Sequence, residues 1–292
     1  MSNFILGDLN TKFKVGGDDC SIYLGTTLVY SGGTPPTPHD YLQDYLTFVA
    51  LEDGTFSFSG TSTANCLSYS TDSGTTWSEP ARYITTPTIT NGNTVMWKGN
   101  LIPMPSYGSG TFSATNNFNA EGNVMSCLFG DEFSGQTDLT EYSYAFNKLF
   151  SGNTKIISAE NLIIPATTLS TYCYQSMFRG CIGLVTPPKL PATTVINRCY
   201  DGMFCGCTSL TTAPELPAAT LATRCYNIMF SGCTSLNNIT CLATDISASN
   251  CTTSWVRNVA ASGTFYKSPN MNNWTTGANG IPNNWIVQDY TR

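Results

Sequence analysis

The stretch that decides the fold is CYDGMFCGCTSL, residues 199–210, in which three cysteines fall within nine positions. Similar stretches stand 26 residues before and after it, as CYQSMFRGCIGL (173–184) and CYNIMFSGCTSL (225–236). Two series of cysteines share this period: Cys173, Cys199, Cys225 and Cys251, and Cys181, Cys207 and Cys233. A fixed period of this length indicates short structural units that stack on one another and bury together what none could bury alone.

Two degenerate copies flank these three. The earlier one reads YAFNKLFSGNTKI and has Asn153 where the later copies have cysteine. The last one places Cys251, Trp255 and Val256 at the positions of the cysteine, methionine and phenylalanine.

Each copy predicts one helix and one short strand. Val195, Cys199 and Met203 are spaced four apart, which places them on one face of a helix. Thr193 or Thr194 can cap its start, and Gly206 follows its end, where a left-handed residue is favoured. The segment TSLTT then predicts a short strand before the proline-bounded turn APELPA.

This pattern resembles the BspA-type leucine-rich repeats of gut-bacterial surface proteins and of their phages, over residues 126–259. The resemblance implies an α+β fold in which a helix/strand leucine-rich-repeat solenoid follows N-terminal β domains. The sequence departs from the pattern at Asn153 and at Pro187-Pro188, where the next copy has Ala213-Pro214.

The cysteines have three interpretations. They can be small packed side chains, disulfide partners in adjacent copies, or zinc ligands. Of the three in the opening stretch, only Cys205 lies outside the two periodic series. Zinc needs about four converging ligands, and the sole histidine, His39, lies far away, so we expect reduced, buried thiols and no metal or cofactor.

Residues 1–31 predict a small β module. FKVGGDDCSIYLGTTLVY (13–30) contains two short strand-like runs around a polar turn. The phrase IYLGTTLVY resembles N-terminal modules of phage tail and fibre proteins, which implies docking on a virion by these residues: Ile22, Tyr23, Leu24, Leu28, Val29 and Tyr30. Residues 32–40 predict an extended proline-rich linker.

Residues 41–125 predict a β-sandwich of about seven short strands separated by Gly, Asp and Asn turns. Within it, STDSGTTW (70–77) resembles the Asp-box of sialidases, a structural hairpin in that family. We expect Asp72 to close the turn, Gly74 to take a positive φ and Trp77 to pack. The alternative is a part in a glycan-active enzyme.

Residues 260–292 break the repeat and predict a cap, in which GTFYK and WIVQDY pair and cover the end of the stack. Trp274 and Trp285 serve this cover or form a sugar-stacking platform. Tyr174, Tyr200 and Tyr226 form a column at the repeat spacing and are candidates for a surface that binds a glycan, or else belong to the edge of the core.

Composition narrows the function. Charged residues make up 11% of the chain and the net charge is −6, without a basic stripe, so we expect no nucleic-acid binding. We find no basic leader and no apolar run of the roughly 20 residues that cross a bilayer, so we expect no membrane insertion. Neither a triad nor an acid/base pair of carboxylates stands out, so we expect no enzyme.

The leading hypothesis is a structural phage protein, located in the virion as part of a tail, baseplate or head fibre. Its N-terminus would bind other virion proteins, its repeats would meet a host-surface glycan or protein, and several copies would assemble. The alternatives are a bacterial surface adhesin or interaction protein and, more remotely, a glycan-active enzyme.

Overall fold

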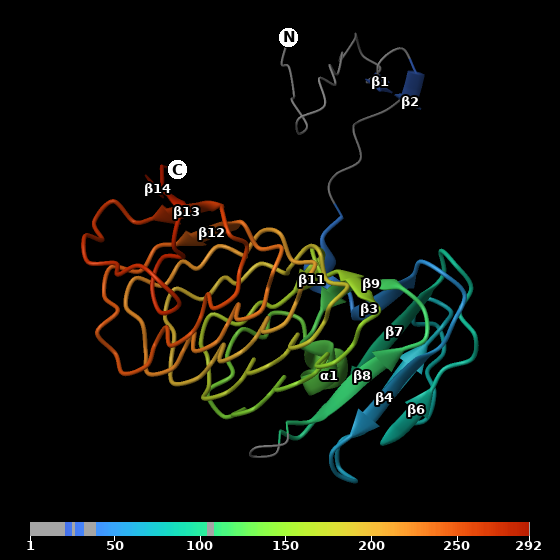
Figure 1. The fold of residues 1–292 in the computed structure, drawn as a ribbon. Coiled ribbons are helices and arrows are strands. Elements are labelled where there is room, and N and C mark those ends of the chain that lie inside the picture. The colour runs from blue at the N-terminus through green and yellow to red at the C-terminus, as the bar shows by residue number, and fades with distance from the viewer. Residues whose placement is uncertain (1–20, 25–26, 32–38, 104–107, 292) are drawn as a thin grey trace. The chain divides into compact units, whose positions relative to one another are not determined.

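The computed structural model describes residues 21–24, 27–31, 39–103 and 108–291 (Figure 1). The chain divides into two compact units, Met1–Asp40 and Tyr41–Arg292. The boundary falls where the expected linker ends and the expected sandwich begins.

The N-terminal unit contains an antiparallel pair of strands, β1 (Ser21–Leu24) and β2 (Thr27–Ser31). Ile22 pairs with Tyr30, and the register shifts before Tyr23 pairs with Leu28. The predicted pair of short strands is confirmed in this range, while residues 13–20 lie outside the described part of the chain.

In the region predicted as a sandwich, residues 41–103 and 108–125 contain seven strands, after a short 3-10 helix, η1 (Tyr41–Gln43). They are β3 (Leu46–Ala50), β4 (Phe56–Gly60), β5 (Leu67–Ser70), β6 (Tyr83–Thr85), β7 (Thr94–Gly99), β8 (Gly110–Ala114) and β9 (Phe118–Asn123). One sheet has the order β10-β9-β3-β7-β5, in which β10 is Ile156–Ser158, and the other has the order β6-β4-β8.

Aromatic rings fill the space between these two sheets. Phe48 of β3 lies 4.9 Å from Phe112 of β8 and 5.4 Å from Phe56 of β4, measured between ring centroids. All three side chains are fully buried or nearly so, and they form an apolar contact between the sheets. The region is therefore β-rich, with two sheets around a shared core, as is compatible with a β-sandwich.

The remaining elements correct the predicted α+β class. They are α1 (Ser126–Phe129), the 3-10 helix η2 (Gly130–Glu132), β10 (Ile156–Ser158), β11 (Leu162–Ile163), β12 (Asn238–Cys241), β13 (Thr264–Lys267) and β14 (Ile286–Asp289). Within the described residues α1 is the only α-helix, and it precedes the cysteine repeats. The structure is mostly β, and the expected helix/strand leucine-rich-repeat solenoid is wrong.

Chains of tight turns stand where helices were predicted. We call them the turn segments: residues 142–153, 170–181, 196–207, 222–233 and 248–259. In the second of them, Gln175 N–H donates to the Tyr172 carbonyl three residues back, whereas Ser176 N–H donates to Asp201 in the next copy. This alternation continues along the segment, so every second amide closes a turn and the others join adjacent copies.

The turns require a left-handed backbone at every fourth residue. φ is +61° at Tyr172, +54° at Ser176 and +73° at Gly180, and equivalent positions in the other copies are also positive. A left-handed conformation costs about 1–2 kcal/mol for a residue other than glycine, so the ladder between copies must hold it in place.

In a turn segment, pairs of fully buried apolar side chains alternate with pairs of mostly polar positions, which we call outward. Cys173 and Tyr174 are fully buried, Gln175 and Ser176 are at outward positions, where Gln175 is half-buried and Ser176 is 7% exposed, and Met177 begins the next buried pair. The burial period is thus four residues, close to the 3.6 of a helix, which explains why the sequence pattern predicted the wrong element.

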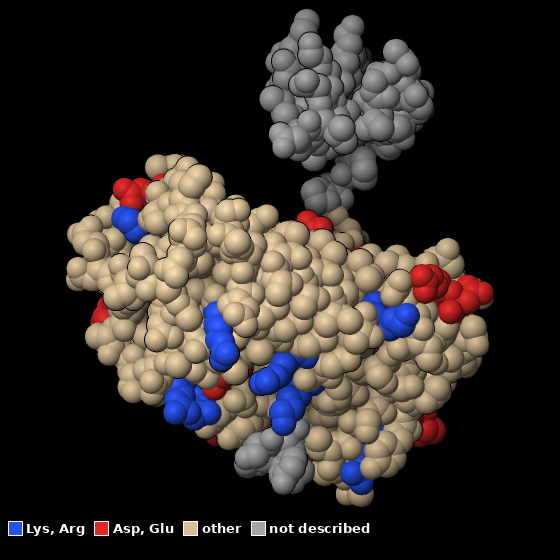
Figure 2. Space-filling view, viewed as in Figure 1, with Lys and Arg blue, Asp and Glu red and all other residues tan. Residues whose placement is uncertain are grey.

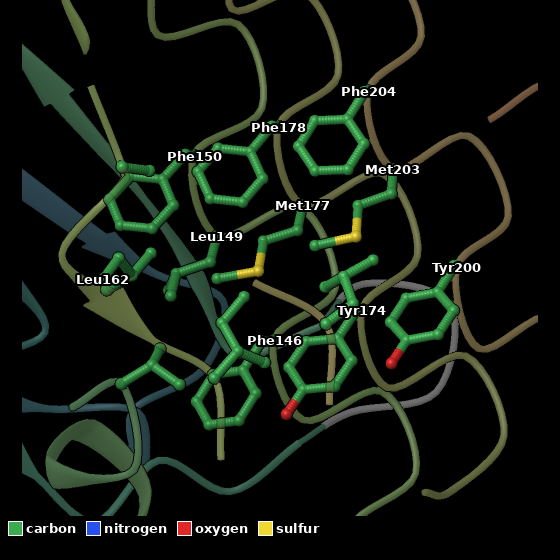
Figure 3. Close-up of a cluster of buried hydrophobic side chains, with 14 of the residues drawn as sticks. Phe146, Leu149, Phe150, Leu162, Tyr174, Met177, Phe178, Tyr200, Met203 and Phe204 are labelled. Atoms are coloured by element: carbon green, nitrogen blue, oxygen red, sulfur yellow. The ribbon is translucent and has the colours of Figure 1, made fainter. Parts of the chain in front are cut away.

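Inward side chains of equivalent positions stack into columns (Figure 3). The Phe150, Phe178 and Phe204 rings lie nearly parallel, with centroids 5.2 Å and 5.5 Å apart along the column. Phe230 extends the column at 5.8 Å from Phe204. Because these rings are fully buried, burial and dispersion contacts between copies stabilise the stack.

Other structure covers both ends of this stack. At the first end, β10 and β11 pair in parallel with β9, and the Phe150 ring stacks on Phe112. At the last end, β12, β13 and β14 form a parallel sheet, and Trp274 stacks on Trp255 at 5.6 Å. The predicted pairing of GTFYK with WIVQDY is confirmed as β13 with β14.

Candidate functional site

The two cysteine series line the interior of the stack. Cys181 Sγ donates a 3.1 Å hydrogen bond to the Phe150 carbonyl of the preceding copy, and Cys207 Sγ donates one of 3.0 Å to Phe178. All members of both series are buried and reduced, which confirms the packed interpretation. Cys205 is half-buried. Burial raises the pKa of the Cys173 thiol to about 12, so it is a poor nucleophile at neutral pH.

Metal ligation finds no support in this arrangement. Among the residues that the structure describes, no three His, Cys, Asp or Glu side chains are grouped to hold an ion. The cysteines instead repeat along the stack, and the thiols of Cys181, Cys207 and Cys233 donate to backbone carbonyls of the preceding copy.

The column of Tyr174, Tyr200 and Tyr226 lies in the interior as well. Their exposed fractions are 0%, 1% and 1%, and adjacent rings stack at 5.7 Å and 6.2 Å. Figure 3 shows Tyr174 and Tyr200 in the row that begins with Phe146. The structure thus places these rings in the core alternative, where they offer no face to a ligand.

The remaining candidate residues lie at the two ends of the chain. Trp285 is buried and its Nε1 donates to the Ala260 carbonyl at 2.9 Å, while Trp274 is half-buried on Trp255. Both tryptophans therefore belong to the structure that covers the last end of the stack. The docking candidates of 21–31 lie in β1 and β2, and their side chains are outside the described part of the structure.

The Asp-box lookalike forms the expected hairpin turn. Asp72 accepts hydrogen bonds from Ser70 Oγ at 2.7 Å, from Thr76 N at 2.9 Å and from Thr76 Oγ1 at 2.6 Å. Gly74 has a φ of +83°, and its carbonyl accepts a 3.0 Å hydrogen bond from Trp77 Nε1. The structural interpretation of these residues is confirmed.

Asp72→Ala is expected to loosen this turn and to lower the thermal midpoint slightly, because the loop is exposed. Hydrogen bonds from Thr76 and Ser70 lower the pKa of Asp72 to about 2. A depressed carboxyl pKa stabilises the fold above the unfolded value and ceases to do so as the pH falls through about 2. The midpoint difference between wild type and variant, measured by thermal melts, should therefore be present near neutral pH and vanish toward that pH. A difference that persists unchanged there would contradict this account.

The outward positions of the turn segments form a continuous face, which we call the turn face. Its columns include Tyr144, Tyr172, Arg198 and Arg224 at one position of the repeat. The Tyr144 and Tyr172 rings are parallel within 7° and 4.5 Å apart, and the Arg198 guanidinium lies 5.3 Å from the Tyr172 centroid. Such parallel rings, half-buried rather than covered, leave one edge toward solvent.

A ladder of amide and carboxylate groups runs beside that column. Asn147 Nδ2 donates to Gln175 Oε1 at 2.7 Å, and Asn227 Nδ2 donates to Asp201 Oδ1 at 2.8 Å. Arg198 completes the group with an ion pair of 3.5 Å to Asp201. These contacts fix the side chains in register from one copy to the next.

A groove lies along the proline-bounded turns of the repeats. Its volume is about 740 Å³, and its walls come from the segments 185–193 and 211–217 together with Glu160. Prolines provide most of the apolar lining: Pro187, Pro188, Pro191, Pro214 and Pro217. Lys189 and Glu215 also line the groove, and the Tyr290 hydroxyl donates a 2.8 Å hydrogen bond to the Glu215 carboxylate.

Sequence reasoning missed the turn face. The predicted helices gave no reason to group Tyr144, Tyr172 and Arg198 as one surface. A signal was present, since the repeat period of 26 residues aligns Arg198 with Arg224, and the match of YAFNKLFSGN to YCYQSMFRGC aligns Tyr144 with Tyr172.

No helix in the described ranges has the length and apolar character that a membrane crossing requires. No family model matches the chain, and no curated protein or solved structure is similar to it at a significant level. Inferences about function therefore depend on the architecture and surfaces described above.

Proposed function

We propose that this protein is a non-catalytic structural component of a phage particle that presents its stacked copies to the surface of a host cell. The N-terminal unit, Met1–Asp40, would hold the protein on the particle. The larger unit, Tyr41–Arg292, would make the contact with the host. The resemblance of IYLGTTLVY to phage docking modules and of the repeats to bacterial surface proteins supports both assignments.

The observation that carries the proposal is the use of the reactive side chains as interior packing. The periodic thiols and phenols are buried in columns, and burial raises their pKa values. The pKa of Cys225, for example, is raised to about 12. Groups held neutral inside a stack are poor catalysts but good structural contacts. What remains at the surface is a regular face, which suits a binding scaffold.

Deletion of residues 1–31 is expected to abolish incorporation of the protein into particles, because it removes β1 and β2. The measurement is the amount of protein in purified particles produced with the truncated gene. Since Tyr41–Arg292 is a compact unit of its own, the truncated chain should remain folded, and its circular dichroism and thermal midpoint provide the control. Normal incorporation of a folded, truncated chain would contradict the docking role.

A further inference from the structure

Charge is unevenly distributed over the repeats. The turn segments carry five cations, Lys148, Arg179, Arg198, Arg224 and Arg257, and a single acid, Asp201, in a chain whose net charge is −6. Figure 2 shows Lys and Arg side chains gathered over the repeats on one side of the Tyr41–Arg292 unit. The turn face is therefore cationic on an otherwise acidic protein.

The single acid does not cancel this charge at the surface. Asp201 is 4% exposed and is held by Asn227 and Arg198. Arg198 and Arg224 both act on its carboxyl electrostatically, and Arg179 acts on the adjacent Cys205 thiol. Two guanidinium groups, those of Arg198 and Arg224, therefore act on one buried carboxylate and leave a net positive charge.

Aromatic rings adjoin the positive centre. Arg198 belongs to the same column as the Tyr144–Tyr172 pair and lies over the Tyr172 ring. Lys148 and Arg257 are exposed on other outward columns of the face. A planar aromatic edge next to guanidinium groups fits a ligand with an apolar ring face and carboxylates on its rim.

We propose that the turn face binds an acidic polysaccharide, with Arg179, Arg198 and Arg224 pairing to carboxylates of uronic-acid type and the Tyr144–Tyr172 pair contacting the sugar rings. This inference rests on the proposed attachment role and names the class of surface polymer that the repeats would meet. Equivalent positions in successive copies lie about one stacking distance apart, with ring centroids at 4.5 Å for the tyrosine pair. A linear polymer can therefore contact several copies at once.

Nucleic acid is the competing polyanion, and the surface fits it less well. Duplex binding depends on many closely spaced phosphate contacts. The turn face has five cations spread over five copies, and the remainder of the chain is acidic. A polymer with one carboxylate per sugar ring matches this charge density better, so nucleic acid becomes an outcome of the test.

The experiment compares two double variants with equal loss of charge. Arg179→Gln/Arg224→Gln changes the turn face, whereas Lys155→Gln/Lys189→Gln removes two positive charges outside the turn segments. The probe is oligogalacturonate, with neutral dextran as a blank and a duplex DNA oligomer as the rival, measured by titration calorimetry at low salt. We expect the first variant to weaken oligogalacturonate binding about tenfold, the effect of losing charge-assisted contacts, and the second to change it less than about twofold.

A second pair of substitutions separates sugar recognition from charge alone. Tyr144→Asn/Tyr172→Asn keeps a residue that tolerates the positive φ, as Asn250 does at the same position of the last copy. Wild type should prefer oligogalacturonate to polyglutamate of equal charge, and this variant should lose that preference while its thermal midpoint shows it folded. Absence of the preference in wild type would overturn the sugar assignment.

Three further results would overturn the inference. Wild type could fail to bind oligogalacturonate, or both double variants could lose the same affinity for it. Wild type could also bind duplex DNA at least as tightly as oligogalacturonate, with this DNA binding abolished by Arg179→Gln/Arg224→Gln. Cell attachment distinguishes this inference from the function it rests on. Attachment that survives the arginine variant unchanged would remove the turn face but leave the attachment role. If wild type binds oligogalacturonate but does not bind cells, the binding role of the turn face stands and the attachment role is overturned.

Discussion

Raising the pH above about 9 is expected to unfold the Tyr41–Arg292 unit cooperatively, within one to two pH units. Eight buried thiols have pKa values raised by burial above their ordinary value of 9.0: Cys127, Cys173, Cys181, Cys199, Cys207, Cys225, Cys233 and Cys241. Four of these values lie at about 12, namely Cys173, Cys225, Cys233 and Cys241.

The direction follows from proton binding. Above pH 9 the unfolded chain ionises these thiols while the folded chain keeps them protonated, so the unfolded state binds fewer protons and the free energy of unfolding falls as the pH rises. Each thiol contributes about 1.4 kcal/mol per pH unit in this window, and eight together contribute roughly 11 kcal/mol per unit. A typical domain has about 5–15 kcal/mol in total. The contribution of the thiols is fully present below pH 9.

The slope of unfolding free energy against pH measures the effect. Cys181→Ala/Cys207→Ala/Cys233→Ala removes one column and should reduce the slope above pH 9 by three protons, whatever its effect on stability at neutral pH. Cys66→Ala is the control, because this thiol is half-buried and lies outside both cysteine series. Denaturant titrations at a series of pH values give the slope. A free energy that stays flat between pH 9 and 11 would show that the thiols ionise in the folded state.

Phe204→Ala is expected to destabilise the fold by about 3–5 kcal/mol, the usual cost of removing a fully buried ring. Phe204 is 0% exposed and stacks between Phe178 at 5.5 Å and Phe230 at 5.8 Å. Because each copy contacts chiefly its neighbours, a gap in the middle of the stack also weakens the coupling between its two halves. Urea unfolding should therefore show a lower midpoint and a shallower or two-step transition.

Two controls separate these effects. Phe204→Leu keeps an apolar side chain of similar size and should cost less than about 1.5 kcal/mol. Phe58→Ala removes a ring that is 1% exposed from β4 and should cost as much as Phe204→Ala without splitting the transition of the stack. If Phe204→Ala left a single, equally steep transition, the copies would be coupled by contacts other than this column.

The sequence predicted burial far better than it predicted backbone. The period of 26 residues identified every thiol of the two series as interior, and the Asp72 turn and the β13–β14 pair followed from local residue chemistry. These features depend on spacing or on a few neighbouring residues, which a single sequence contains.

The helix prediction failed because a burial period of four residues fits two backbone conformations, an α-helix and a chain of tight turns. Cys199 and Met203 lie on one face of a helix, and they also point the same way in a chain of tight turns. Only the partner of each alternate amide distinguishes the two, and that partner, such as Cys225 for Tyr200, lies in the next copy. The turn face was missed for the same reason, since a helix would have spread its side chains around an axis.

The separate covers at the two ends of the stack have a consequence for evolution. A duplicated or deleted 26-residue unit in the middle meets the same neighbours as before, while the β9–β11 junction and the Trp274 cover stay unchanged. The reach of the protein can thus be lengthened or shortened by recombination within one gene, with neither terminus redesigned.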